Sequence, residues 1–180
     1  MKKLIIIASA FFVLIVYMAV REKIENSSPI HCKHVNRISD AFLDVASEKY
    51  GLACSGKGGA LMDKVNSVTL VFDSQEENVP VERVRRLFVN SVEDYLSRIN
   101  DDEKLRPYLS HYPFTQSGVN FRISFQATKK DEIYLVFLSH GKIIYMTKDE
   151  NQAPLVKLSE ETYEEAREIV MAERSSAIAR

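Results

Sequence analysis

Thiol and imidazole side chains are the groups in this chain that could bind a metal or attack a substrate. His31, Cys32 and His34 lie within four residues, and Cys54 follows further along the chain. Two cysteines and two histidines can hold a structural zinc ion, but such sites usually contain a Cys-x2-Cys pair, which is missing here. We therefore predict no metal site. Because two cysteines tend to pair in an oxidising compartment, we predict a disulfide between Cys32 and Cys54, with two free thiols as the alternative.

Cys54 is also the candidate nucleophile of an enzyme, with His111 or His140 as its base. The sequence does not bring these residues together. His140 precedes Gly141 where a turn between two strands is expected, and His111 lies in a segment rich in aromatic residues. We assign no catalytic residue, and a thiol or hydrolytic enzyme using Cys54 with a histidine is the alternative function.

Residues 55–59 read Ser-Gly-Lys-Gly-Gly, which invites a comparison with phosphate-binding loops. A P-loop follows a strand, opens a helix and places Ser or Thr directly after its lysine. Here Lys57 is followed by Gly58, a helix is expected before the loop, and a strand is expected after it. We predict a flexible connection at this point and no bound nucleotide or other cofactor.

Periodic apolar residues indicate the elements that would position these groups. Helical spacing predicts helices over residues 36–50 and 80–100. A third helix is predicted to begin at Ser159, because serine is a favourable N-cap and two glutamates follow it. The segment Leu105–Phe114 contains two prolines and several large apolar residues, which predicts a structured cap folded onto the core rather than a long helix.

Alternating apolar residues predict strands over residues 67–74, 119–126, 133–138 and 142–147. The expected fold class is α+β, with a four-stranded, mainly antiparallel sheet packed by about three helices. The apolar residues between Val119 and Phe125 share the sheet face that must meet the core. The other face is either covered by helix 36–50 or left open as a contact surface centred on Tyr134, Val136 and Ile144.

The stretch from Leu4 to Val20 is 17 residues without a charge and follows Lys2 and Lys3. This length and position predict a transmembrane helix that anchors the chain in a lipid bilayer. The expected organisation is an anchor at 1–21, a juxtamembrane linker at 22–35 and one extracytoplasmic domain at 36–180. The alternative is a cleaved signal sequence and a secreted protein, although the bulky Tyr17 makes a poor cleavage site.

Two motifs, GGALM near residue 60 and RPYLSHYPF near residue 110, resemble those of small uncharacterised bacterial proteins with N-terminal signal anchors. The resemblance covers residues 36–147 and implies no activity.

Charge excludes one class of partner. Without the first 26 residues, the chain has 20 basic and 23 acidic residues, a net charge of −3, so nucleic acid is a poor partner. Because no reactive constellation is evident, we predict a membrane-anchored extracytoplasmic interaction or structural module, whose partner is another protein or a second copy of the chain.

Overall fold

The computed structural model describes residues 28–127, 129–148 and 155–178. Within them the chain forms three α-helices and six strands. In chain order these are α2 (Ile30–Tyr50), β1 (Leu52–Ala60), β2 (Ser67–Glu77), α3 (Val81–Asp101), β3 (Val119–Gln126), β4 (Leu135–Ser139), β5 (Lys142–Lys148), β6 (Leu155–Thr162) and α4 (Tyr163–Ile178).

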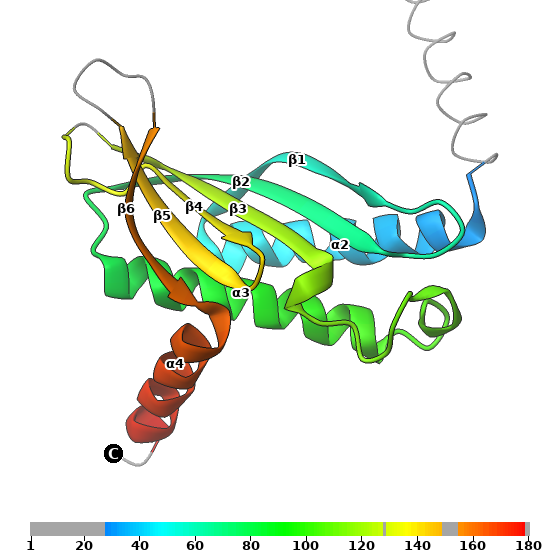
Figure 1. Cartoon of the computed structure of the whole chain (residues 1–180). Helices are drawn as coiled ribbons and strands as arrows, with labels where there is room; N and C mark the ends of the chain where they lie inside the picture. The colour runs from blue at the N-terminus through cyan, green and yellow to red at the C-terminus, as the bar shows by residue number, and fades with distance from the viewer. Residues whose placement is uncertain (1–27, 128, 149–154, 179–180) are drawn as a thin grey trace, which may run out of the picture.

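All six strands belong to one sheet, in which they lie side by side in chain order (Figure 1). β2 and β3 run parallel, and every other neighbouring pair is antiparallel. A parallel pair needs a long crossover connection, and the segment containing α3 provides it. The predicted α+β class is confirmed. The predicted four-stranded sheet is wrong, because the sheet has six strands and is mixed.

α2 and α3 cover the same face of the sheet (Figure 1). Phe42 of α2 and Phe88 of α3 both contact Phe121 of β3, with ring centroids 6.3 and 5.5 Å away. Phe42 also packs against Tyr95 of α3, so the two helices meet each other above the sheet. The structure therefore does not place helix 36–50 on the second face, and that face carries no helix of the described chain.

The core lies between this helical layer and the sheet. In β2 and β3 every second side chain is buried, and the residues between them point to the uncovered face. Val68, Leu70 and Phe72 are among the buried ones, each at most 1% exposed. Burying a large apolar side chain contributes ~1.5–3 kcal/mol, so this strict alternation sets which face of each strand meets the helices.

β1 corrects the prediction of a flexible loop at residues 55–59. The segment pairs with β2 along its whole length, with an irregularity between Cys54 and Gly56. Glycine has a low strand propensity and gives no alternating pattern, so the local sequence does not indicate a strand here. The segment becomes a strand because it pairs with β2. Only glycine fits at position 59, because a Cβ there would overlap the carbonyl oxygen of Ser67 on β2.

β6 corrects the prediction that the last helix begins at Ser159. That residue pairs with Tyr145 of β5 as part of the strand. The helix begins after Thr162, whose Oγ1 accepts a hydrogen bond from the backbone N–H of Glu165 at 3.2 Å. Glu165 Oε2 in turn accepts from the backbone N–H of Thr162 at 3.0 Å, which completes a reciprocal capping box.

The other predicted elements agree with the structure at their centres. Helix 80–100 and the strands at 119–126, 133–138 and 142–147 are confirmed by α3, β3, β4 and β5. The predicted cap is also confirmed, since Leu105, Leu109 and Phe114 are buried. α2 begins at Ile30, so part of the predicted linker 22–35 is helical.

No helix within residues 28–127, 129–148 and 155–178 is long and apolar enough to cross a bilayer. The predicted span Leu4–Val20 lies outside these described residues. This finding corrects the predicted transmembrane anchor and single-pass membrane localisation, neither of which is retained.

Candidate functional site

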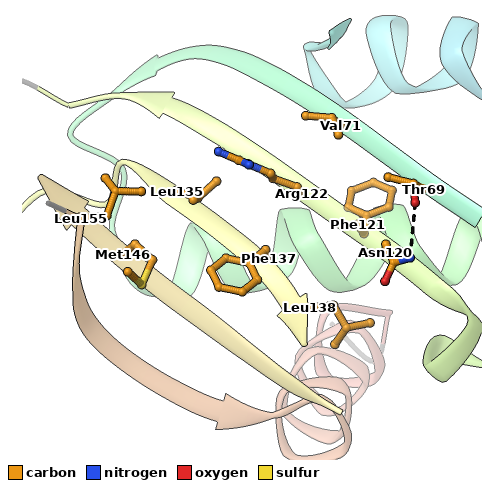
Figure 2. A pocket seen from close by; sticks show the side chains of 10 residues that line it. All are labelled: Thr69, Val71, Asn120, Phe121, Arg122, Leu135, Phe137, Leu138, Met146 and Leu155. Atoms are coloured by element: carbon orange, nitrogen blue, oxygen red, sulfur yellow. Dashed lines mark hydrogen bonds between the residues drawn. The ribbon is translucent and has the colours of Figure 1, made fainter. Parts of the chain in front are cut away.

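A groove of about 480 Å³ lies on the sheet face that the helices leave uncovered (Figure 2). It crosses five strands, from β2 to β6. Because these strands pair side by side, residues that are distant in sequence lie close together in the groove. The groove is lined by Thr69, Val71, Asn120, Phe121, Arg122, Leu135, Phe137, Leu138, Met146 and Leu155.

The two halves of the groove differ in chemistry (Figure 2). Polar side chains gather over β2 and β3, where Asn120 Nδ2 donates a hydrogen bond to Thr69 Oγ1 at 3.3 Å and Arg122 lies alongside. Apolar side chains gather over β4, β5 and β6. This apolar half is formed by Leu135, Phe137, Met146 and Leu155.

Strand register explains how the apolar half forms. Leu135 lies opposite Met146, and Phe137 lies opposite Ile144, so these four side chains share one face of the β4–β5 hairpin. Leu135 is only 4% exposed, yet it is outside the main core cluster. A sheet face that is turned to solvent usually carries polar residues. Here β4 and β5 carry apolar residues on both faces.

Arg122 is exposed in the groove, where it projects from β3 between Val71 and Leu135 (Figure 2). In register it lies opposite Val71 on β2 and Phe137 on β4, both apolar. Among the described residues, no ion pair or hydrogen bond engages its side chain. Five other arginines form ion pairs with carboxylates: Arg37, Arg83, Arg85, Arg86 and Arg167.

Bare backbone continues the uncovered face beyond the groove. Gly56 and Gly58 of β1 lie opposite Val71 and Thr69, on the side of the sheet that faces away from the helices. A Cβ at Gly58 would meet no atom within 4 Å, so nothing fills the space above it. Glycine in a strand allows another backbone to approach closely.

The predicted contact residues are divided between the two faces. Val136 is fully buried in the core, opposite Tyr145. Ile144 lies on the uncovered face, opposite Phe137 and next to the groove. Tyr134 precedes β4, and its ring packs under the ammonium of Lys148 at 3.8 Å. The structure thus puts Ile144 on the uncovered face of this hairpin and Val136 on the core face, and whether the uncovered face makes contacts stays a prediction. Leu135 and Phe137 lie on the uncovered face in place of Tyr134 and Val136.

The two cysteines are free thiols, so the structure does not contain the predicted disulfide. Cys32 is half-buried, and its Sγ donates to the carbonyl oxygen of Leu61 at 3.5 Å. Cys54 is exposed on the edge strand β1. A count of free thiols in solution would distinguish two free cysteines from a disulfide.

Neither candidate base lies beside Cys54. His140 follows β4, three strands away from β1, which corresponds to ~14 Å across the sheet. Its Nδ1 is 2.9 Å from Ser139 Oγ. His111 stacks on Phe114, with ring centroids 5.2 Å apart. It follows Ser110, which bonds to Val65, seven residues before the Phe72 that lies opposite Cys54. The geometry therefore gives the thiol-enzyme alternative no nucleophile–base pair.

His31 has a structural role at the start of α2. It is 6% exposed, and its Nε2 lies 2.9 Å from the carbonyl oxygens of both Leu61 and Met62. Its ring also stacks on Tyr108. These contacts fasten α2 to the loop between β1 and β2. No cluster of three or more metal-ligating side chains occurs in the described part of the chain.

A second cavity of about 290 Å³ lies between α2 and α3. Arg37 and Asp102, which form an ion pair, are among the residues that line it. Burial raises the pKa of Asp102, but the hydrogen bonds from Arg37 and the backbone N–H of Leu105 outweigh it and hold the pKa below its ordinary value. Both charges are thus already satisfied within the chain, which favours a role in joining the helices.

Sequence reasoning did not single out Arg122, Leu135 or Phe137 as site residues, although apolar residues on both sides of strand 133–138 were a usable signal. Only the register shows which of the two apolar sets faces away from the helices. No protein-family model, curated protein or solved structure matches the chain, so its own geometry is the basis for a function.

Proposed function

We propose that this domain is a binding module that holds a partner on the uncovered face of its sheet. The observation that carries the proposal is the apolar groove that contains Arg122, a cation without a carboxylate partner among the described residues. Binding sites typically combine apolar walls with a small number of placed polar groups. The groove has this composition, and its volume of about 480 Å³ falls within the range of ~300–1,000 Å³ for such sites.

The distribution of apolar residues supports the same proposal. Phe137, Ile144 and Met146 are half-buried with no helix of the described chain above them, and Leu155 is 37% exposed. A partner that covered these side chains would gain ~25 cal/mol of favourable free energy per Å² of apolar surface removed from water. Contiguous apolar surface of this kind marks interaction sites.

The test uses anilinonaphthalene sulfonate, an aromatic anion whose fluorescence rises on apolar surface. We expect the folded chain to bind this dye and Phe137→Asp to abolish the binding. Arg122→Gln should weaken it by roughly fivefold at most, since an exposed charge pair contributes up to ~1 kcal/mol. The matched control for Phe137→Asp is Met62→Asp, because the Met62 side chain is 83% exposed and lies outside the groove. The matched control for Arg122→Gln is Arg83→Gln, because Arg83 is an exposed arginine on α3.

Unfolding curves must accompany the dye titration, because partly folded proteins also bind the dye. Cooperative unfolding and an unchanged near-ultraviolet circular dichroism spectrum would show that each variant keeps its packing. If the folded wild type binds no dye, or if the Phe137 and Met62 variants bind it equally, the groove is not a binding site.

A further inference from the structure

We propose that the groove binds a segment of a partner protein in which an acidic residue is flanked by large apolar residues. The inference rests on the proposed function and specifies its ligand. A carboxylate would lie over β3, against Arg122, and apolar side chains would lie over β4, β5 and β6.

Charge complementarity gives the first reason. The guanidinium is a planar fork whose parallel N–H donors match the two oxygens of a carboxylate. Asp73 is the nearest carboxylate of the same face by register, two positions along β2 from Val71, and it forms no ion pair with Arg122. The apolar neighbours Val71 and Phe137 would lower the local dielectric once a partner excludes water, which strengthens the pairing.

The dimensions of the groove give the second reason. It crosses from β2 to β6, four strand spacings, or ~19 Å at ~4.8 Å each. An extended chain advances ~3.3 Å per residue, so about six residues would span the groove. The polar residues are confined to one end of this path and the apolar residues to the other, so the acidic residue must lie toward one end of the segment.

The open shape of the site favours a protein segment over a small molecule. The groove is formed by one layer, the sheet, and no helix of the described chain lies above it. Small-molecule pockets usually enclose ~70–90% of their ligand. A protein partner would instead supply the second wall itself. The bare backbone at Gly56 and Gly58 allows that wall to approach the sheet closely.

A second copy of the chain fits this face less well. A two-fold dimer would place the same surface against itself, so two copies of Arg122 would enter one interface. The Glu160 carboxylate on β6 is already held by Lys142 and Lys157, at 2.6 and 3.0 Å. The face also carries Asp73, which forms no ion pair among the described residues, so a second copy would bring one carboxylate together with a second guanidinium, whereas an acidic segment brings the carboxylate alone.

The experiment measures binding of three pools of capped, dye-labelled hexapeptides to the full chain by fluorescence anisotropy. Five positions carry a mixture of Leu, Val, Phe and Met, and the second position is Glu, Gln or Lys. We expect the wild type to prefer the Glu pool to the Gln pool by roughly tenfold, the equivalent of ~1.4 kcal/mol. Arg122→Gln should remove this preference, and Arg122→Glu should transfer it to the Lys pool. Arg83→Gln is the control and should bind as the wild type does.

The failing outcomes separate this inference from the proposed function. Equal binding of the Glu and Gln pools would overturn the acidic segment, while dye binding could still support a groove. A preference for Glu that survives Arg122→Gln would overturn the role of this arginine. Displacement of the dye by decanoate without binding of any peptide pool would identify a small amphiphile instead. A dimer in sedimentation that Phe137→Asp dissociates would identify a second copy. Either of these results would also overturn the inference.

Discussion

Glu161 offers the sharpest test of how this fold is held together, because its carboxylate joins three elements. Arg85 Nε of α3 lies 2.9 Å from both carboxylate oxygens, and the hydroxyl of Tyr145 on β5 donates to one of them. The Arg85 and Glu161 side chains are only 18% and 15% exposed. Burial, together with the hydrogen bond to Glu161, raises the pKa of Tyr145 above its ordinary value, so the hydroxyl remains a donor throughout the neutral range.

The change Glu161→Gln keeps the shape of the side chain and removes its charge. A hydrogen bond to a charged group contributes ~1.5–3 kcal/mol, and removing one member of a fully buried ion pair costs ~3–5 kcal/mol. Arg85 keeps some exposure and the amide keeps one acceptor oxygen, so we expect a loss of ~2 kcal/mol in the free energy of unfolding. With a urea slope of ~1–3 kcal/mol per molar, the unfolding midpoint should fall by ~1 M.

Urea unfolding followed by circular dichroism at pH 7 measures this shift. Glu160→Gln is the matched control, because Glu160 precedes Glu161 on the same strand and pairs with Lys142 and Lys157 at the exposed surface. It should leave the midpoint unchanged. The double variant with Arg85→Gln should lose less than the sum of the single variants, as expected for directly coupled groups. Equal midpoints for the Glu160 and Glu161 variants would refute the reasoning.

Three further predictions concern β1, α4 and the contact between α2 and α3. Gly59→Ala should destabilise the fold by ~1–3 kcal/mol because its Cβ would overlap a backbone carbonyl of β2, whereas Gly58→Ala, which points into open space, should cost less; urea midpoints compare them. Thr162→Ala removes the cap of α4 and should lose ~1 kcal/mol and some helical circular dichroism, and a loss equal to zero would contradict the capping box. Burial raises the pKa of Asp94, but hydrogen bonds from Lys49 and a tyrosine hydroxyl outweigh it and lower the pKa. The stabilisation relative to Asp94→Asn should therefore be present at pH 7 and disappear as the pH falls below about 4, and a difference that persists at pH 2 would contradict this sign.

Elements with a strong local pattern were predictable from the sequence. α3 has a long apolar stripe, and β3 alternates strictly from Val119 to Gln126. Neighbouring residues in the sequence therefore indicate whether each position is buried or exposed. The cap around Leu105 and Phe114 was also predictable, because its prolines exclude a long helix and most of its large apolar side chains favour burial.

The two edge strands were not predictable in this way. β1 contains four residues of glycine or alanine between Gly56 and Ala60, and all of β6 except Glu161 is exposed. Neither segment has an alternating core face that would give it a strand signature. Each becomes a strand because a neighbouring strand satisfies its backbone hydrogen bonds, and that neighbour is chosen by tertiary structure.

By itself, the sequence determined that the domain has an α+β core and that β4 and β5 carry apolar residues on both faces. Only the tertiary structure decided which apolar set meets the helices. Side chains alternate between the two faces of a strand, and α2 and α3 both lie on one of these faces. The tertiary structure also decided which charges are paired. Arg85 finds Glu161 76 residues away, while Arg122 is surrounded in register by Val71 and Phe137. Such pairings depend on contacts between distant parts of the chain, which no local pattern in the sequence encodes.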